Sequence, residues 1–183
     1  NSFAHFPRIK RRCRLREPMH RQHFNQSASS ERGRKKGAVN SEYNQFIGNS
    51  RGGKTTKIHA VVDALGNPVH FMLTGGQVHD ASAAIDLLAE LEIAGSNILA
   101  DKAYGSQTIR EYIMEQKASY TIPPRENCAN PWPCDFYTYK ERHLVECFFN
   151  KLKVFRRVAT RYDKLAVSFL AFVHLASIWI LLK

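Results

Sequence analysis

Short apolar runs alternate with helical segments between residues 58 and 122, and this alternation most constrains the fold. Four runs have the length and composition of β-strands, at 58–62, 69–74, 97–100 and 119–122. The first two runs flank the turn-forming residues 63–68, which predicts a hairpin. Helices are predicted around the third strand, at 81–92 and 107–117. Because strands and helices alternate, we expect a layered α/β domain.

Capping residues and prolines indicate where the helices begin. Asp80 and Ser106 stand just before the two helical segments and are predicted as their N-caps. Residues 125–138 are expected to form a loop, in which Trp132 either fills the loop core or stacks on a nucleic-acid base. Two longer helices are predicted after this loop, at 139–155 and 164–182.

The stretch from Leu165 to Leu182 is mostly apolar and just reaches the length of a membrane-spanning helix. A helix that closes the core of a soluble domain needs the same composition. Since the rest of the chain has the polarity of a soluble protein, we expect no membrane partner. The four cysteines have no CxxC spacing, which favours a reduced, intracellular protein.

The net charge of +11 lies entirely in the first third of the chain. Residues 1–57 contain 14 of the 27 Lys and Arg residues, only 3 of the 16 acidic residues, and no aspartate. Their periodicity is poor. We therefore expect a poorly ordered basic segment at 1–50 and a folded domain at 51–183. A basic segment on a neutral domain favours a polyanion such as nucleic acid as partner, the alternative being a solvated tail.

The helix predicted at 139–155 gathers polar side chains on one face. At 100° per residue, one narrow face of this helix carries four residues: Tyr139, Arg142, Glu146 and Lys153. A separate apolar stripe can dock on a sheet. A carboxylate on such a face can hold a hard metal ion, and the basic groups can bind phosphates. The alternative is a surface helix with an internal Arg142–Glu146 pair.

A second acidic candidate, Asp101, ends the apolar run 97–100. Ligands of open α/β sheets bind beyond the carboxyl ends of strands, where this residue is expected. Two carboxylates, one at a strand end and one on a helix, could share divalent cations for phosphoryl transfer. The alternative is that Asp101 serves only as an N-cap or loop residue.

The four residues of the helix face match the Y-(2)-R-(3)-E-(6)-K signature, and the chain resembles bacterial insertion-sequence DDE transposases. Stretches at 50–60, 63–68 and 99–104 are similar to the same family, so the resemblance covers about residues 50–183. It implies an RNase H-like mixed sheet flanked by helices. It also implies metal-dependent strand cleavage and strand transfer on terminal inverted repeats and target DNA.

The resemblance also implies roles for particular residues. Asp101 and Glu146 would be the second and third catalytic acids and would bind Mg²⁺ (or Mn²⁺). Tyr139, Arg142 and Lys153 would contact DNA or its phosphates. Further DNA-binding residues are expected on both sides of the acids: Arg51, Lys54, Lys57, Arg156 and Arg157. The protein is expected to act as a homo-oligomer on DNA in the bacterial cytoplasm, associated with the nucleoid.

The chain departs from the family at the first catalytic acid. The family places that aspartate on a strand upstream of the Arg-Gly-Gly-Lys loop, which is 51–54 here, but no aspartate precedes Asp63. Asp63 itself falls in the predicted hairpin turn. We therefore expect an N-terminal segment that is truncated or disrupted and a transposase with impaired catalysis. The alternative is a non-catalytic DNA-binding remnant.

Overall fold

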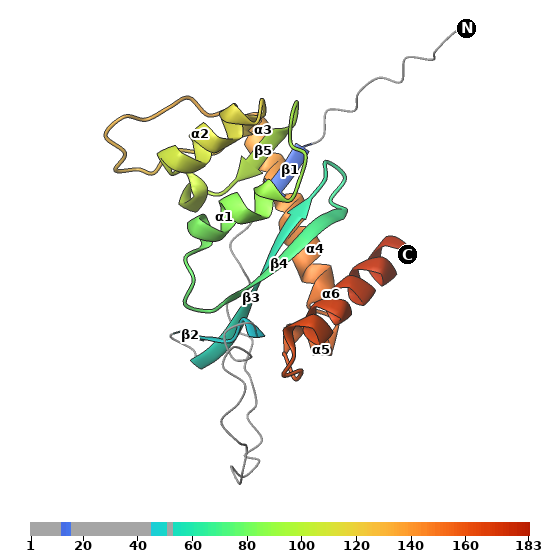
Figure 1. The fold of residues 1–183 in the computed structure, drawn as a ribbon. Coiled ribbons are helices and arrows are strands. Elements are labelled where there is room, and N and C mark those ends of the chain that lie inside the picture. The colour runs from blue at the N-terminus through green and yellow to red at the C-terminus, as the bar shows by residue number, and fades with distance from the viewer. Residues whose placement is uncertain (1–11, 16–44, 51–52) are drawn as a thin grey trace, which may run out of the picture.

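A computed structural model describes residues 12–15, 45–50 and 53–183 of the chain (Figure 1). Its elements follow one another as β1 (Arg12–Leu15), β2 (Gly48–Ser50), β3 (Gly53–Val62), β4 (Pro68–Gly75), α1 (Asp80–Ala89), β5 (Asn97–Ala100), η2 (Lys102–Tyr104), α2 (Gln107–Glu115), β6 (Ser119–Thr121), α3 (Phe136–Tyr139), η3 (Lys140–Arg142), α4 (His143–Leu152), α5 (Arg156–Ala159) and α6 (Ala166–Leu181). The predicted mixed α/β class is confirmed.

The sheet has an antiparallel half and a parallel half, which meet at β1. Strand β1 is antiparallel to β3, with Arg14 opposite Val62, and parallel to β5, with Leu15 opposite Ala100. On one side β4 and β2 pair antiparallel with β3, and on the other β6 runs parallel to β5. The carboxyl ends of β1 and β5 therefore lie at the same end of the sheet.

Strand β1 corrects the expectation for residues 1–50. Poor periodicity predicted no regular element there, yet Arg12–Leu15 lies at the centre of the sheet and Gly48–Ser50 extends its antiparallel half. The strand is not recognisable from the sequence, because the charged residues Arg12 and Arg14 interrupt the apolar pattern that predicts strands. Most of the predicted basic segment, at 1–11 and 16–44, lies outside the described residues.

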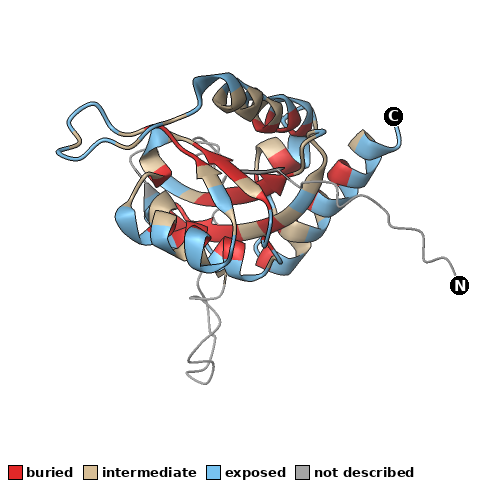
Figure 2. Ribbon diagram, turned by 90° about the horizontal axis from the view of Figure 1, so that it is seen from above, coloured by how far each residue is buried: buried red, intermediate tan, exposed pale blue. Residues whose placement is uncertain are grey.

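Helices cover both faces of the sheet, and each face has its own core (Figure 1). Strand β3 alternates between them: Ile58, Ala60 and Val62 join a cluster with α4, α5 and α6, whereas Val61 joins a cluster with α1 and α2. This period of two follows from strand geometry. The buried strands lie between helices whose outer sides are exposed (Figure 2).

The hairpin and one predicted cap are confirmed in detail. The Asp63 carboxylate accepts hydrogen bonds from the backbone N–H of Leu65 (2.8 Å) and of Asn67 (2.9 Å), so this aspartate serves the turn. Ser106 Oγ accepts from Ile109 N–H at 3.3 Å and caps α2. The prediction that Asp80 is an N-cap is wrong, because α1 already includes Asp80 and its N-cap is His79.

The region 139–155 is not the single long helix that the sequence predicts. The structure divides it among α3, η3 and α4, and α4 ends at Leu152. Its predicted apolar stripe is buried against β3 and β4, with Val145, Phe148, Phe149 and Leu152 in the core. The last predicted helix is present as α6. In the part of the chain that the structure describes, no helix is long and apolar enough to cross a membrane.

Candidate active site around Asp101

Asp101 stands where a fully buried strand ends. The side chains of Ile98, Leu99 and Ala100 are completely buried in β5, so the position of the next residue is firmly held. Asp101 has the N-cap position of the short helix η2, yet its side chain makes no capping hydrogen bond there. The carboxylate instead turns toward the segment that leads into α4.

Arg142 joins the two candidate acids. Its Nε lies 3.1 Å from Asp101 Oδ1, its Nη1 donates to Asp101 Oδ2 at 3.3 Å, and the same Nη1 lies 2.9 Å from Glu146 Oε1. Tyr139 Oη donates to Asp101 Oδ1 at 3.1 Å. The internal Arg142–Glu146 pair considered from the sequence therefore exists, but the same guanidinium also reaches the strand end. Asp101 and three residues of the signature face form one connected group.

The charges in this group influence one another strongly because the side chains are largely shielded from water. The Arg142 side chain is 19% exposed and that of Asp101 is 22% exposed. Partial burial and then the negative charge of Asp101 raise the pKa of Tyr139 above its usual value. Partial burial opposes the charged form of Arg142, but Asp101, Tyr139 and Glu146 outweigh it and raise the pKa of Arg142. Arg142 therefore stays a cation at every physiological pH.

The two acids are suitable in kind for a divalent cation. Carboxylate oxygens are hard ligands, and Mg²⁺ in proteins is commonly held by one or two carboxylates together with substrate phosphates. Within the described ranges, no group of three His, Cys, Asp or Glu side chains is placed to hold a metal ion. Strand β1, the direct neighbour of β5, reads Arg12-Cys13-Arg14-Leu15 and brings no carboxylate to the sheet.

The basic residues predicted to contact DNA have different surroundings. Lys54 in β3 and Lys153 and Arg156 after α4 are exposed. Arg157 is also exposed, but its Nη2 lies 3.3 Å from Asp163 Oδ1 and its guanidinium stacks 4.0 Å from the Phe172 ring centroid. Arg51 lies outside the described residues. Lys153 follows Glu146 by two helical turns, about 10 Å along the axis.

Two basic side chains are occupied inside the fold. Lys57 Nζ donates to Val78 O and to Asp80 Oδ1, each at 2.7 Å, and only 10% of its side chain is exposed. This geometry argues against the predicted DNA contact of Lys57. Arg161, which follows α5, is 2% exposed. It donates to Thr56 Oγ1 at 2.6 Å and to three backbone carbonyls.

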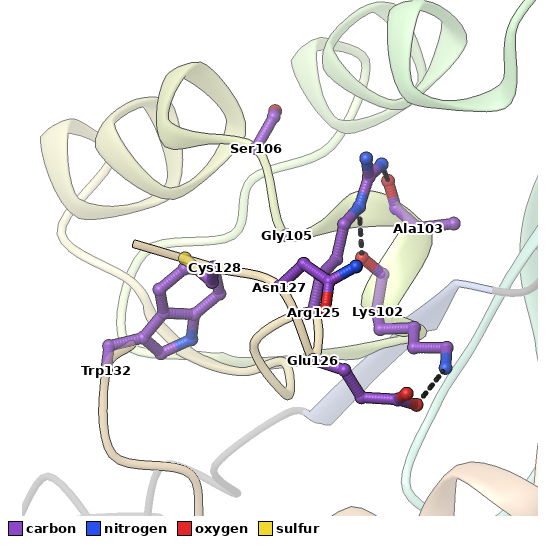
Figure 3. A pocket seen from close by; sticks show the side chains of 9 residues that line it. All are labelled: Lys102, Ala103, Gly105, Ser106, Arg125, Glu126, Asn127, Cys128 and Trp132. Carbon is purple, nitrogen blue, oxygen red and sulfur yellow. Dashed lines mark hydrogen bonds and ion pairs between the residues drawn. The ribbon is translucent and has the colours of Figure 1, made fainter. Parts of the chain in front are cut away.

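A cavity of about 730 Å³ opens beside the residue that follows Asp101. Figure 3 shows Trp132 and Cys128 on one side of it and the Lys102–Glu126 pair, 3.1 Å apart, on the other. The Arg125 guanidinium donates to the backbone carbonyl of Ala103 at 3.3 Å. Sequence reasoning missed Arg125, which contacts the backbone just after Asp101, since nothing in its spacing after two prolines indicates this position.

Trp132 is fixed as part of the cavity wall. Its indole N–H donates to Ile122 O at 2.7 Å, and the Arg110 guanidinium lies 3.6 Å from its ring centroid. Both contacts are internal. Of the two roles considered for Trp132, they support the filling of the loop core.

Two family models and a curated protein match this chain. Residues 18–130 match a family model described as a transposase DDE domain, and residues 98–183 match a second model of the same description. Among curated proteins, the chain is similar to one named as a transposase for insertion sequence element IS6501 from Brucella ovis. The two are 42% identical over 130 residues, which cover 70% of this chain and 99% of that protein.

Proposed function

The chain belongs to the DDE transposase domain family, and on this premise we propose that it acts on the ends of a bacterial insertion sequence. The proposed reaction is metal-dependent cleavage of terminal inverted-repeat DNA and strand transfer to target DNA. One observation carries the proposal: Asp101 at the end of β5 and Glu146 on α4 meet at Arg142, with Tyr139 bound to the same carboxylate. Such a protein would work in the cytoplasm, on the nucleoid, as an assembly of copies.

We propose an RNase H-like fold for the domain. The support is the strand order, in which a central β1 joins an antiparallel β3–β4 pair to the parallel strands β5 and β6. The domain predicted at 51–183 then needs revision. Because β1 separates β3 from β5, residues Arg12–Leu15 belong to the same folding unit as 53–183.

Asp101 and Glu146 are the proposed ligands of Mg²⁺ or Mn²⁺. A bound divalent cation would activate the attacking oxygen and stabilise charge on the leaving oxygen of the phosphodiester. The protein's contribution is to fix the position of the two carboxylates, one through the buried strand β5 and one through the docked helix α4. Arg142 holds both carboxylates in this arrangement and compensates part of their negative charge.

The other signature residues are proposed to bind DNA. The planar guanidinium of Arg142 can exchange a carboxylate for a phosphate, since both accept paired hydrogen bonds. Tyr139 orients Asp101 through its hydroxyl. The exposed cations Lys54, Lys153 and Arg156, with Arg157 beside them, would contact the phosphate backbone.

We further propose that catalysis in this chain is impaired. The family's first acid would stand before 51–54, and the sequence has no aspartate there. Removing one of three acids lowers the negative charge that offsets two cations and loosens in-line geometry. A displacement of about 1 Å can reduce a rate about 100-fold. Cleavage should therefore be weak rather than efficient.

A cleavage and binding assay tests these statements. The full chain is incubated with duplexes that carry the element's terminal repeats, with Mg²⁺ or Mn²⁺, beside Asp101→Asn and Glu146→Gln. Glu126→Gln is the matched control, since that acid is exposed in the Lys102 pair. Weak cleavage that both site variants abolish and the control retains supports the proposal. Efficient cleavage that depends on Glu146 would overturn the proposal that catalysis is impaired.

The alternative function is DNA binding without catalysis. The composition of β1 favours it, because the described strand Arg12–Leu15, which pairs with β5, contains no acidic residue. Four phosphate contacts predict that log K falls against log salt with a slope of roughly −4. Binding of this kind with no cleavage under either metal supports the alternative. If no DNA binding is found at low salt, both functions are refuted.

A further inference from the structure

The outward side of α6 is apolar except for His174, which is unusual for a helix at the surface. The helix Ala166–Leu181 contains no Asp, Glu, Lys or Arg. Its inner side packs on the sheet through Phe169, Val173 and Ala176. Surface helices normally place charged and polar residues opposite such a stripe, and a helix that is apolar all round is normally buried. Figure 2 shows α6 with its outer side exposed near the C-terminus.

The exposed side chains follow the spacing of a coiled-coil seam. Positions on the outer side recur at intervals of four, three, four and three residues: Val167, Ala171, His174, Ile178 and Leu181. Four of them are apolar, and the His174 ring meets that of Phe71 in β4 edge-on, with 5.3 Å between the ring centroids. All five are exposed, and at 100° per residue they fall within an arc of about 80°. This is the pattern by which two helices pack knobs into holes. Leu175 and Leu182 widen the seam on one side.

The exposed area is large enough for a stable contact. Six large apolar side chains of this surface range from 49% exposed for Leu181 to 81% for Leu182, the others being Val167, Leu175, Ile178 and Trp179. Together they expose on the order of 500 Å² of apolar surface, at roughly 100 Å² per aliphatic side chain and 200 Å² for tryptophan. A standard interface buries about 800 Å² per partner, somewhat over half of it apolar. This single helix supplies that apolar share.

A groove lies beside the seam. It has a volume of about 360 Å³ and runs between α5 and α6. Its lining is mostly apolar, with Phe155, Phe172, Leu175 and Trp179, and also includes Arg156 and Arg157. The Trp179 side chain is 60% exposed at its edge. The surface therefore combines an exposed aromatic side chain with a largely apolar hollow that two arginines also line.

We propose that the outer side of α6 is the interface between two copies of this chain, related by a two-fold axis. A two-fold interface uses the same patch on both partners, and a seam that is apolar apart from His174 is complementary to itself. Charges flanking a seam select a different partner or an orientation. Helix α6 contains no Asp, Glu, Lys or Arg, although Arg156 and Arg157 line the groove beside it. This inference rests on the oligomeric part of the proposed function and assigns a surface to it. The surface lies on the sheet face opposite α1 and α2.

Sedimentation velocity of the free full chain over about 1–100 μM tests this surface. We expect a dimer whose dissociation constant rises at least 100-fold in Ile178→Glu, since two carboxylates would be forced into the apolar seam. Ile178 is 52% exposed, so the substitution leaves the monomer folded, which circular dichroism checks. Leu65→Glu is the matched control, because Leu65 is 81% exposed in the β3–β4 turn and should leave the dimer unchanged.

Three results would overturn the assignment. A chain that stays monomeric at 100 μM has no such interface. A dimer that Ile178→Glu leaves intact uses another surface, and the oligomeric part of the proposed function then survives without α6. Co-flotation of the protein with phosphatidylcholine vesicles, lost in Ile178→Glu, would mean that lipid covers this side. None of these readouts depends on DNA cleavage, so failure of the catalytic proposal remains distinguishable.

Discussion

Replacing Arg142 by glutamine tests whether the acids at the strand end and on α4 are held together by one cation. The substitution keeps a polar side chain but removes the positive charge between Asp101 and Glu146. Both carboxylates then repel each other without compensation, and Tyr139 remains the donor to Asp101. We expect the folded state without metal to be destabilised, because it keeps two partly shielded negative charges close together.

The size of the effect follows from the contacts. Arg142 makes three charge-assisted contacts, at 3.1 and 3.3 Å to Asp101 and 2.9 Å to Glu146. Removing one partner of a fully buried ion pair costs about 3–5 kcal/mol. The three side chains here are 19–37% exposed, so solvent screens part of this loss. We therefore expect a loss of about 2 kcal/mol, or roughly 4–8 °C in Tm for a chain of this size.

Urea unfolding in the presence of EDTA measures the change in a double-mutant cycle with Asp101→Asn. The double variant should lose at least about 1 kcal/mol less than the sum of the single variants, because the Asp101–Arg142 interaction is removed only once. Lys102→Gln serves as control. It breaks an ion pair whose side chains are 61% and 87% exposed, and such pairs contribute about 0.5 kcal/mol or less. The reasoning is refuted if the losses in the free energy of unfolding of the two single variants simply add, or if Arg142→Gln loses no more than Lys102→Gln.

Two further predictions concern the core. Burial lowers the pKa of His59 from 6.5 to about 4, despite the opposing charge of Asp80. The unfolded chain therefore binds more protons between these values, and stability falls by up to about 3 kcal/mol as the pH drops from 6.5 to 4. In His59→Gln this part of the pH dependence of the free energy of unfolding, measured with urea, should disappear. If the variant and the unchanged protein lose stability in parallel between pH 6.5 and 4, the prediction is contradicted. Arg161→Lys should cost about 2–3 kcal/mol, because an ammonium cannot reach all the acceptors of the buried guanidinium. Thermal melts measure this loss, and the exposed Arg156→Lys should leave the Tm unchanged in them; equal effects of the two variants would contradict the prediction.

Local patterns predicted much of the fold because the elements concerned are held by local chemistry. The turn at Asp63 and the cap at Ser106 are formed by hydrogen bonds within four residues, which the sequence displays directly. Strand β5 was recognisable because it is a continuous apolar run that ends at Asp101. The grouping of Tyr139, Arg142 and Glu146 followed from helical spacing, although the helix is divided there.

Features that depend on partners far away in the sequence could not be predicted. The burial of Lys57 depends on Asp80 and that of Arg161 on Thr56, separated by 23 and 105 residues. A lysine or arginine is predicted to lie at the surface when its buried partner is unknown. Strand β1 was missed for the same reason, since its pairing with β3 and β5 is entirely non-local.

The central position of β1 has a consequence for how this protein can be divided. Without Arg12–Leu15, strand β3 and strand β5 would face each other as two unpaired edges, and the sheet would separate into an antiparallel and a parallel half. A fragment that starts at residue 51 would therefore be prone to aggregation. A short peptide that contains Arg12–Leu15 could fill the gap by donating its backbone to both edges, as in strand complementation between chains. The strand Arg12–Leu15 thus joins the two halves into one cooperative sheet.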